Sequence, residues 1–246
     1  MLKLWCYLPF ITLLCIPAIH AVSLDKKHIN SKIIQPFTAQ YKIIRQNDTV
    51  GSAVRKLIYI DHNKAQYSYQ TDIKWLIFSD NRQERSIVTL NENQVSPLQY
   101  YYNREGTGTD KNYQWRYDLA NSSATDINKN RTVTINFPDN IQDKLSYHFQ
   151  HRLNIKNNPK QKHFVYPVID TSGKIKNYVY QFDGEEELML PYGTITTIRM
   201  KREVIEKEKI TYAWFAPKLD YLMVKLLQSK KGIEQFQAQL NTLTID

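Results

Sequence analysis

Alternating apolar and polar residues recur along most of the chain. Within Phe37–Ile43, for example, every second residue is apolar. A period of two is typical of a β-strand with one buried face, and Asn, Asp or Gly stands at most of the breaks, where these residues favour turns. The pattern predicts strands over 37–43, 54–60, 65–73, 86–90, 98–103, 113–119, 131–137, 163–169, 175–182, 194–201, 210–215, 221–227 and 233–243.

One segment has the period of a helix instead. Four apolar residues recur there at intervals of four, namely Ile141, Leu145, Phe149 and Leu153. This spacing places them on one face of a helix. Asn140 is a suitable N-cap and Asn157-Asn158-Pro159 is a stop signal, so the pattern predicts one substantial helix between them.

These elements together predict a mostly β protein with a single domain. About a dozen strands with hairpin-length links favour a curled antiparallel meander, a barrel or half barrel, whose one α-helix covers an opening. A two-layer sandwich fits the same pattern and is left open. A curled sheet can hold an apolar ligand, although its own side chains can also fill it.

The first 21 residues have the three parts of a secretory signal peptide. Lys3 supplies the positive charge, residues 4–16 an apolar run, and residues 18–21 a cleavage region. The apolar run is shorter than the roughly 20 residues of a membrane-spanning helix. We therefore expect export to the periplasm, cleavage after Ala21, and no integral membrane span afterwards. A polar lead-in over 22–35 and a β domain over 36–246 would follow.

Composition narrows the chemistry of the exported chain. Both cysteines, Cys6 and Cys15, fall in the expected signal peptide, which excludes a disulfide, a Cys-ligated metal and a cysteine nucleophile from the remainder. Lys3 is the only charged residue of the leader, so the net charge of +9 becomes +8. Outside the cytoplasm such a charge favours anionic lipid headgroups or acidic glycans over nucleic acid, or serves solubility alone.

Catalytic motifs are absent from the sequence. It has no Gly-x-Ser-x-Gly elbow and no phosphate-binding loop. His148 and His151 are three apart on the predicted helix, but no HExxH-like pattern accompanies them, so we expect no metal and no cofactor. Asp143 and the run Glu185-Glu186-Glu187 are candidates for a paired-carboxylate glycosidase site, although such a run is also typical of a solvated hairpin.

Aromatic and basic residues provide the candidate binding site. Trp75, Trp115 and Trp214 can each line an apolar cavity or stack on a ring, although their default place is the core. Basic residues near the C-terminus could meet an anionic headgroup, namely Lys225, Lys230 and Lys231.

The favoured hypothesis is a noncatalytic binding or envelope-maintenance protein for an apolar or amphipathic molecule such as a lipid. Its grounds are the signal peptide, the aromatic strands, the positive charge and the lack of a catalytic motif. A cell-wall glycan hydrolase using paired carboxylates is the first alternative. A structural module that pairs through a strand edge is the second. The oligomeric state is left open.

Dispersed short motifs carry a resemblance to a known family. They are Pro36–Tyr41 followed by Gly51, Ser96–Tyr100, Asp143–Ser146, and Tyr212–Ala216 before Leu222–Val224. On these residues the chain resembles the DUF3108 family of exported bacterial proteins of unknown function, from about Phe37 to Leu240. The resemblance implies an envelope domain dominated by antiparallel strands. It implies no catalytic residues.

Overall fold

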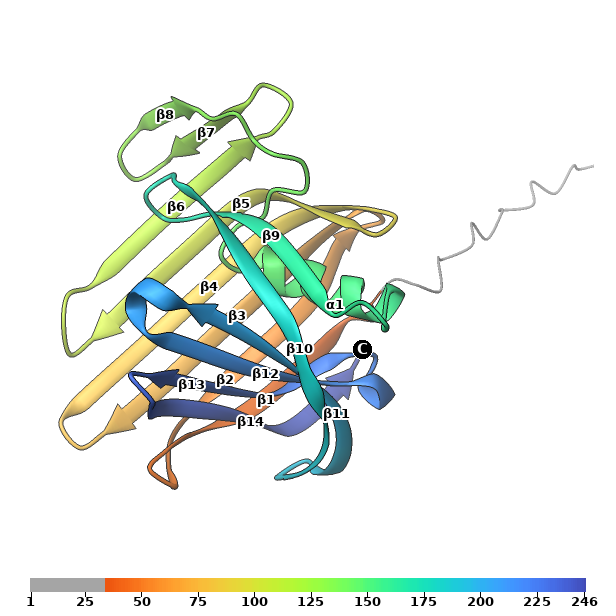
Figure 1. The fold of residues 1–246 in the computed structure, drawn as a ribbon. Helices are drawn as coiled ribbons and strands as arrows, with labels where there is room; N and C mark the ends of the chain where they lie inside the picture. The colour runs from red at the N-terminus through yellow and green to blue at the C-terminus, as the bar shows by residue number, and fades with distance from the viewer. Residues whose placement is uncertain (1–33) are drawn as a thin grey trace, which may run out of the picture.

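A computed structural model describes residues 34–246 as one antiparallel sheet of 14 strands with a single α-helix (Figure 1). The expected signal peptide and most of the polar lead-in lie outside the described residues. The strands are β1 (Phe37–Arg45), β2 (Asp48–Asp61), β3 (Lys64–Trp75), β4 (Phe78–Asn91), β5 (Gln94–Gly106), β6 (Lys111–Asp118), β7 (Ser123–Asp126), β8 (Arg131–Thr134), β9 (His163–Ile169), β10 (Ile175–Leu190), β11 (Gly193–Val204), β12 (Lys209–Ala216), β13 (Leu222–Lys230) and β14 (Ile233–Ile245).

The sheet is a meander with two arms. Strand order runs β8 to β1 and then β14 back to β9, so every neighbouring pair except β1 and β14 is consecutive in sequence. Figure 1 shows the β1–β8 arm curling opposite the β9–β14 arm, with α1 (Ser146–Asn157) between them. β8 and β9 are the edges, so the curled sheet is not closed by strand pairing. The predicted mostly β fold, a curled antiparallel meander with one helix, is confirmed.

Several strands are longer than their apolar pattern predicts. The predicted end of the strand over 175–182 is wrong, because β10 continues through Asp183-Gly184 to Leu190. The pairing of β10 with β11 shifts register between Phe182 and Gly184, and Gly184 has a φ of +123°. A β-bulge inserts an extra residue without ending a strand, and glycine readily takes such a backbone angle.

The helix begins later than its apolar spacing predicts, at Ser146 rather than just after Asn140. Gln142 explains the difference, because its backbone N–H donates to Pro167 and its carbonyl accepts from Ile169. Because of these bonds, the segment before the helix pairs with β9 and is not part of the helix. Asp143 then accepts hydrogen bonds from the backbone N–H groups of Leu145 and Ser146, at 2.8 and 2.6 Å, and so starts the helix.

Two glutamine side chains join the helix and the segment before it to the start of β5 in the β1–β8 arm. Gln142 Nε2 donates to the Val95 carbonyl at 2.7 Å, and Gln150 Oε1 accepts from the Val95 N–H at the same distance. Gln150 Nε2 also donates to the Asn93 carbonyl. The connection between β8 and β9 thereby holds the start of β5 against β9, where no strand pair closes the sheet.

The core lies on the concave face of the sheet and around the helix. Phe149 of α1 stacks on Tyr67 of β3 with ring centroids 5.5 Å apart, and Phe37 of β1 meets Tyr67 edge-on. Both Phe37 and Phe149 are 1% exposed. The helix is thus packed inside the curl rather than lying over an outer surface, and it leaves part of the concave face free. Two short 3-10 turns, η1 (Ile205–Lys207) and η2 (Pro217–Leu219), link the strands around β12.

Gly51 marks a close approach between β2 and β3. A Cβ atom at this position would collide with the backbone carbonyl of Asp72 and with Cα of Ile73. Gly51→Ala is therefore expected to lower the free energy of unfolding by about 1–3 kcal/mol, as overpacking does elsewhere. Urea unfolding measures the change, with the exposed neighbour Ser52→Ala as the control. An unchanged midpoint in Gly51→Ala would contradict the close approach.

Candidate functional site

A cavity of about 650 Å³ lies on the concave side of the sheet. At one side it is lined by Leu145, Tyr147 and His148, from the start of the helix. At the other it reaches Phe78 of β4 and Thr107, next to the turns that end β3 and β5. The cavity therefore runs between the two arms, from the helix to the hairpin ends.

Strand alternation brings the lining residues into the cavity. On β3, Thr71, Ile73 and Trp75 line it, whereas the intervening Asp72 and Lys74 are exposed. Successive side chains of a strand point to opposite faces, so each strand contributes every second residue. The lining is consequently mixed, with aromatic and aliphatic side chains beside charged ones.

Positive charge predominates in this lining. Seven cationic side chains and two carboxylates, Asp80 and Glu84, contribute to it. Two of the cations, Arg82 and Arg104, form ion pairs with Asp80. The other five form no ion pair with a carboxylate of the described chain, namely Arg45, Arg55, Lys144, Arg202 and Lys209.

Arg55 is the most deeply buried of these cations. It is 4% exposed, and its Nε has no hydrogen-bond partner within residues 34–246. Its guanidinium lies 5.6 Å from the centroid of the Tyr67 ring and 5.2 Å from that of Tyr69. Cation–π contacts of this kind stabilise a charge only partly, and a buried charge without an anionic partner is costly.

The two cavity carboxylates have opposite pKa shifts. Burial acts to raise the pKa of Asp80, but hydrogen bonds from Arg82 and Arg104 outweigh it and hold that pKa below its usual value. Burial raises the pKa of Glu84, while Lys144 acts against the shift. Tyr100 donates its hydroxyl to Glu84 at 3.0 Å. Both carboxylates are thus engaged with groups of the protein itself.

Burial and neighbouring cations lower the pKa values of two basic groups of the cavity. Burial, and after it Arg202, lowers the pKa of Lys209 to about 8. Burial followed by Arg55 lowers the pKa of His148 well below its usual range, so the imidazole is neutral at pH 7. Burial is the larger cause of both shifts, and the cations beside these two groups add to it.

The three candidate tryptophans have different surroundings. Trp75 lines the cavity, and the Arg45 guanidinium lies 4.3 Å from its ring centroid. Trp115 is 1% exposed in the core, and a Cβ atom added at Gly173 would come within 3.4 Å of its ring. Trp214 Nε1 donates to Glu186 at 2.7 Å. Neither Trp115 nor Trp214 belongs to the cavity lining, and a ligand-binding role for either stays a prediction.

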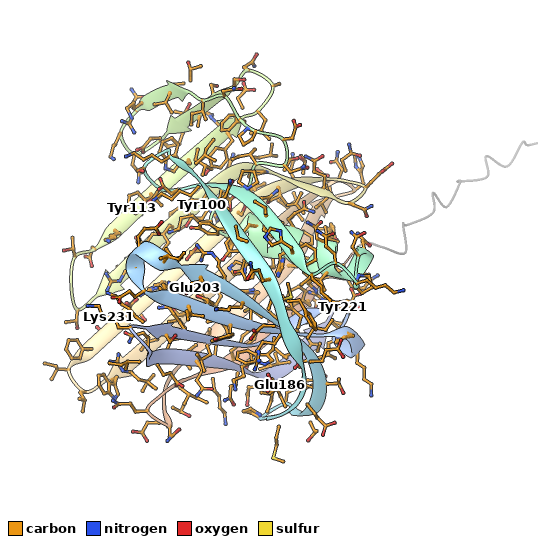
Figure 2. The ribbon with its side chains drawn as sticks, in the orientation of Figure 1. Tyr100, Tyr113, Glu186, Glu203, Tyr221 and Lys231 are labelled. Carbon is orange, nitrogen blue, oxygen red and sulfur yellow. The ribbon has the colours of Figure 1, made fainter. Side chains whose placement is uncertain are left out.

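The three candidate lysines also lie outside the lining. Lys225 Nζ is 4.8 Å from the Trp214 ring centroid. Lys230 and Lys231 stand at the turn between β13 and β14, where Lys231 pairs loosely with Glu208 at 3.7 Å. Figure 2 shows Lys231 at the hairpin ends, on the same side of the molecule as Glu203. The structure thus brings Trp75 to the cavity but does not gather the six predicted residues.

The carboxylates considered for glycan hydrolysis do not converge. Asp143 is fully buried and accepts a hydrogen bond from the Ser86 hydroxyl at 2.5 Å. Its charge contributes to raising the pKa of Tyr100, which therefore marks the neighbourhood of Asp143. Glu186 pairs with Arg199 at 2.8 Å. Figure 2 shows Tyr100 and Glu186 well apart. Because Asp143, Glu185 and Glu186 are all missing from the cavity lining, this cavity offers them no shared substrate position.

The two histidines of the helix lie in different surroundings. His148 lines the cavity, whereas His151 Nδ1 is 2.9 Å from the Tyr166 hydroxyl in the core. Within the described part of the chain, no three His, Cys, Asp or Glu side chains are grouped as a metal site requires.

Sequence reasoning missed Arg55, Arg202 and Lys209. Arg55 stands between the buried Ala53 and Leu57 on β2, in the register that alternation assigns to the concave face. A charged residue in an otherwise apolar register is the signal that could have identified it.

The fold and the cavity together define a β-barrel-like protein with an internal cavity. The family model described as "Protein of unknown function (DUF3108)" matches residues 65–236. The chain therefore belongs to the DUF3108 family, as its short motifs predict. No curated protein matches it.

One solved structure supports the fold. The chain is similar to the beta-barrel-like protein of the DUF1849 domain from Brucella abortus, with a TM-score of 0.54, 7% identity, and coverage of 87% of this chain and 98% of that one. A DUF1089 family protein from Pseudomonas aeruginosa gives a TM-score of 0.37 at 9% identity, over 70% of this chain and 87% of that one. At 7% identity the likeness to the Brucella abortus protein concerns the fold alone. Among the helices of residues 34–246, none has the length and apolarity to span a membrane.

Proposed function

We propose that this protein is a noncatalytic carrier that binds an apolar or amphipathic molecule, such as a lipid, in the bacterial envelope. The observation that carries the proposal is the cavity of about 650 Å³ between the two arms of the sheet. Ligand pockets of small molecules are typically about 300–1,000 Å³ and mostly apolar with a few polar groups. The size and mixed lining of this cavity fit that description.

Apolar side chains supply the driving force for binding. Ile43, Ile73 and Leu226 line the cavity together with Trp75 and Phe236. Each methylene that leaves water for such surroundings contributes about 0.8 kcal/mol. An acyl chain would therefore bind along the space between β3 and β14. Export to the periplasm would place the protein beside its source of lipid.

Titration with two 12-carbon amphiphiles, dodecanoate and dodecanol, tests this function. Native mass spectrometry is expected to show a 1:1 complex with at least one of them, and quenching or enhancement of tryptophan fluorescence should report occupancy next to Trp75. Acetate serves as the control without an acyl chain and should produce no complex. If the protein retains its unliganded mass with both amphiphiles, the carrier function is wrong.

A further inference from the structure

The cationic groups deep in the cavity point to the chemical class of its ligand. Arg55 lines the cavity, is 96% buried and has no carboxylate partner among the described residues. Arg202 also lines it and lies over the Tyr178 ring at 3.6 Å, again without an ion pair in this part of the chain. Neither guanidinium is neutralised by the fold itself.

Arg55 and Arg202 act on the same part of the cavity. They come from opposite arms, β2 and β11, yet both line the same cavity, as do His148 and Tyr180. Both guanidinium groups also act on the pKa values of these two side chains. The buried Arg55 carries a desolvation cost that no carboxylate of residues 34–246 offsets, and Arg202 also has no ion pair in this part of the chain. An oxyanion between the two groups would offset this cost and accept charge-assisted hydrogen bonds from both.

The two carboxylates of the cavity are not available for this purpose. Asp80 is held by Arg82 and Arg104, nearer the hairpin ends. Glu84 accepts from Tyr100 and lies under the influence of Lys144. The protein therefore supplies partners for Arg82 and Arg104 but leaves Arg55 and Arg202 without one.

We propose that Arg55 and Arg202 bind the anionic headgroup of a single-chain amphiphile inside the cavity. This inference rests on the carrier function proposed above and adds the ligand's charge and orientation. The headgroup, a carboxylate or phosphate, lies between the two guanidinium groups, and the acyl chain lies along Ile73, Trp75 and Phe236 toward the hairpin ends. An uncharged lipid of the same length would leave both cations unpaired.

Comparison of dodecanoate with dodecanol tests the headgroup site. The chains match in length, so their difference in affinity reports the charge. Dodecanoate is expected to bind at least about tenfold more tightly, since a hydrogen bond to a charged group usually contributes this much. Arg55→Met should abolish the preference by weakening dodecanoate binding. Lys56→Met, the exposed neighbour on the convex face, is the matched control and should keep the preference.

A second variant covers the case in which Arg55→Met does not fold. Arg202 is only partly buried, so Arg202→Met should fold and should reduce the preference for dodecanoate about tenfold or less. Thermal unfolding followed by circular dichroism establishes which variants are native.

The outcomes separate the two proposals. Equal binding of dodecanoate and dodecanol by the unaltered protein would overturn the headgroup site but leave the carrier function intact. Binding of inorganic phosphate without binding of either amphiphile would overturn the carrier function and assign the two arginines to a free anion. Binding of dodecanoate alone, lost in Arg55→Met and kept in Lys56→Met, would support both proposals.

Discussion

Thr71→Trp is expected to weaken dodecanoate binding by roughly 50-fold or more. Thr71 lines the cavity from the middle of β3 and is 8% exposed, so an indole here would occupy space that the acyl chain requires. Exclusion of three methylenes costs about 2.4 kcal/mol at about 0.8 kcal/mol each, which corresponds to this loss of affinity. Isothermal titration calorimetry measures it directly.

The substitution is well placed to leave the fold intact. The Thr71 hydroxyl has no hydrogen-bond partner in the described part of the chain, so its removal breaks no polar contact. Aromatic residues are also well suited to strands. Gln70→Trp places the same indole one residue earlier, on the exposed convex face, and should bind dodecanoate as the unaltered protein does. Undiminished binding by a folded Thr71→Trp would mean that the ligand lies elsewhere.

Asp143→Ala is expected to lower the free energy of unfolding by about 3 kcal/mol or more. The carboxylate accepts the N–H groups of Leu145 and Ser146 as well as the Ser86 hydroxyl. Each donor left without a partner in a buried position costs about 1–3 kcal/mol. The midpoint of urea unfolding should therefore fall sharply.

Two further variants test whether the loss of stability comes from the hydrogen bonds of Asp143 or from any substitution in this segment. Asp143→Asn retains one amide oxygen that can accept the N–H groups, so it should destabilise the protein less than Asp143→Ala does. Asp139→Ala removes an exposed carboxylate a few residues earlier and should leave the midpoint nearly unchanged. Equal stability of Asp143→Ala and the unaltered protein would show that these bonds do not hold the start of the helix.

Much of the fold could be predicted because half-buried strands have a simple period. Phe37–Ile43 alternates in sequence, and β1 indeed buries Phe37, Ala39, Tyr41 and Ile43. The short β7 was missed because its four residues, Ser123–Asp126, contain one apolar side chain and thus no period. The start of the helix was misplaced because Gln142 pairs with β9, a contact that local spacing cannot reveal.

The site was harder to predict for a physical reason. Apolar residues stand at consecutive positions of β12, as in Ala213-Trp214-Phe215, so the pattern does not tell which face Trp214 occupies. Asp143 has the residue type of a catalytic acid. Its structural role is visible in the hydrogen bond that it accepts from the Ser86 hydroxyl, and Ser86 is 57 residues away in sequence. The sequence marks Arg55 only as a charge in an apolar register, because its lack of a partner depends on both arms of the sheet.

The most direct test of the central claim is native mass spectrometry of the protein purified from its native host, followed by solvent extraction of any bound molecule. The carrier function predicts one bound amphiphile, and the headgroup site predicts that the extracted molecule carries a carboxylate or phosphate. A protein that emerges at its unliganded mass and also fails to bind added dodecanoate and dodecanol would contradict the claim.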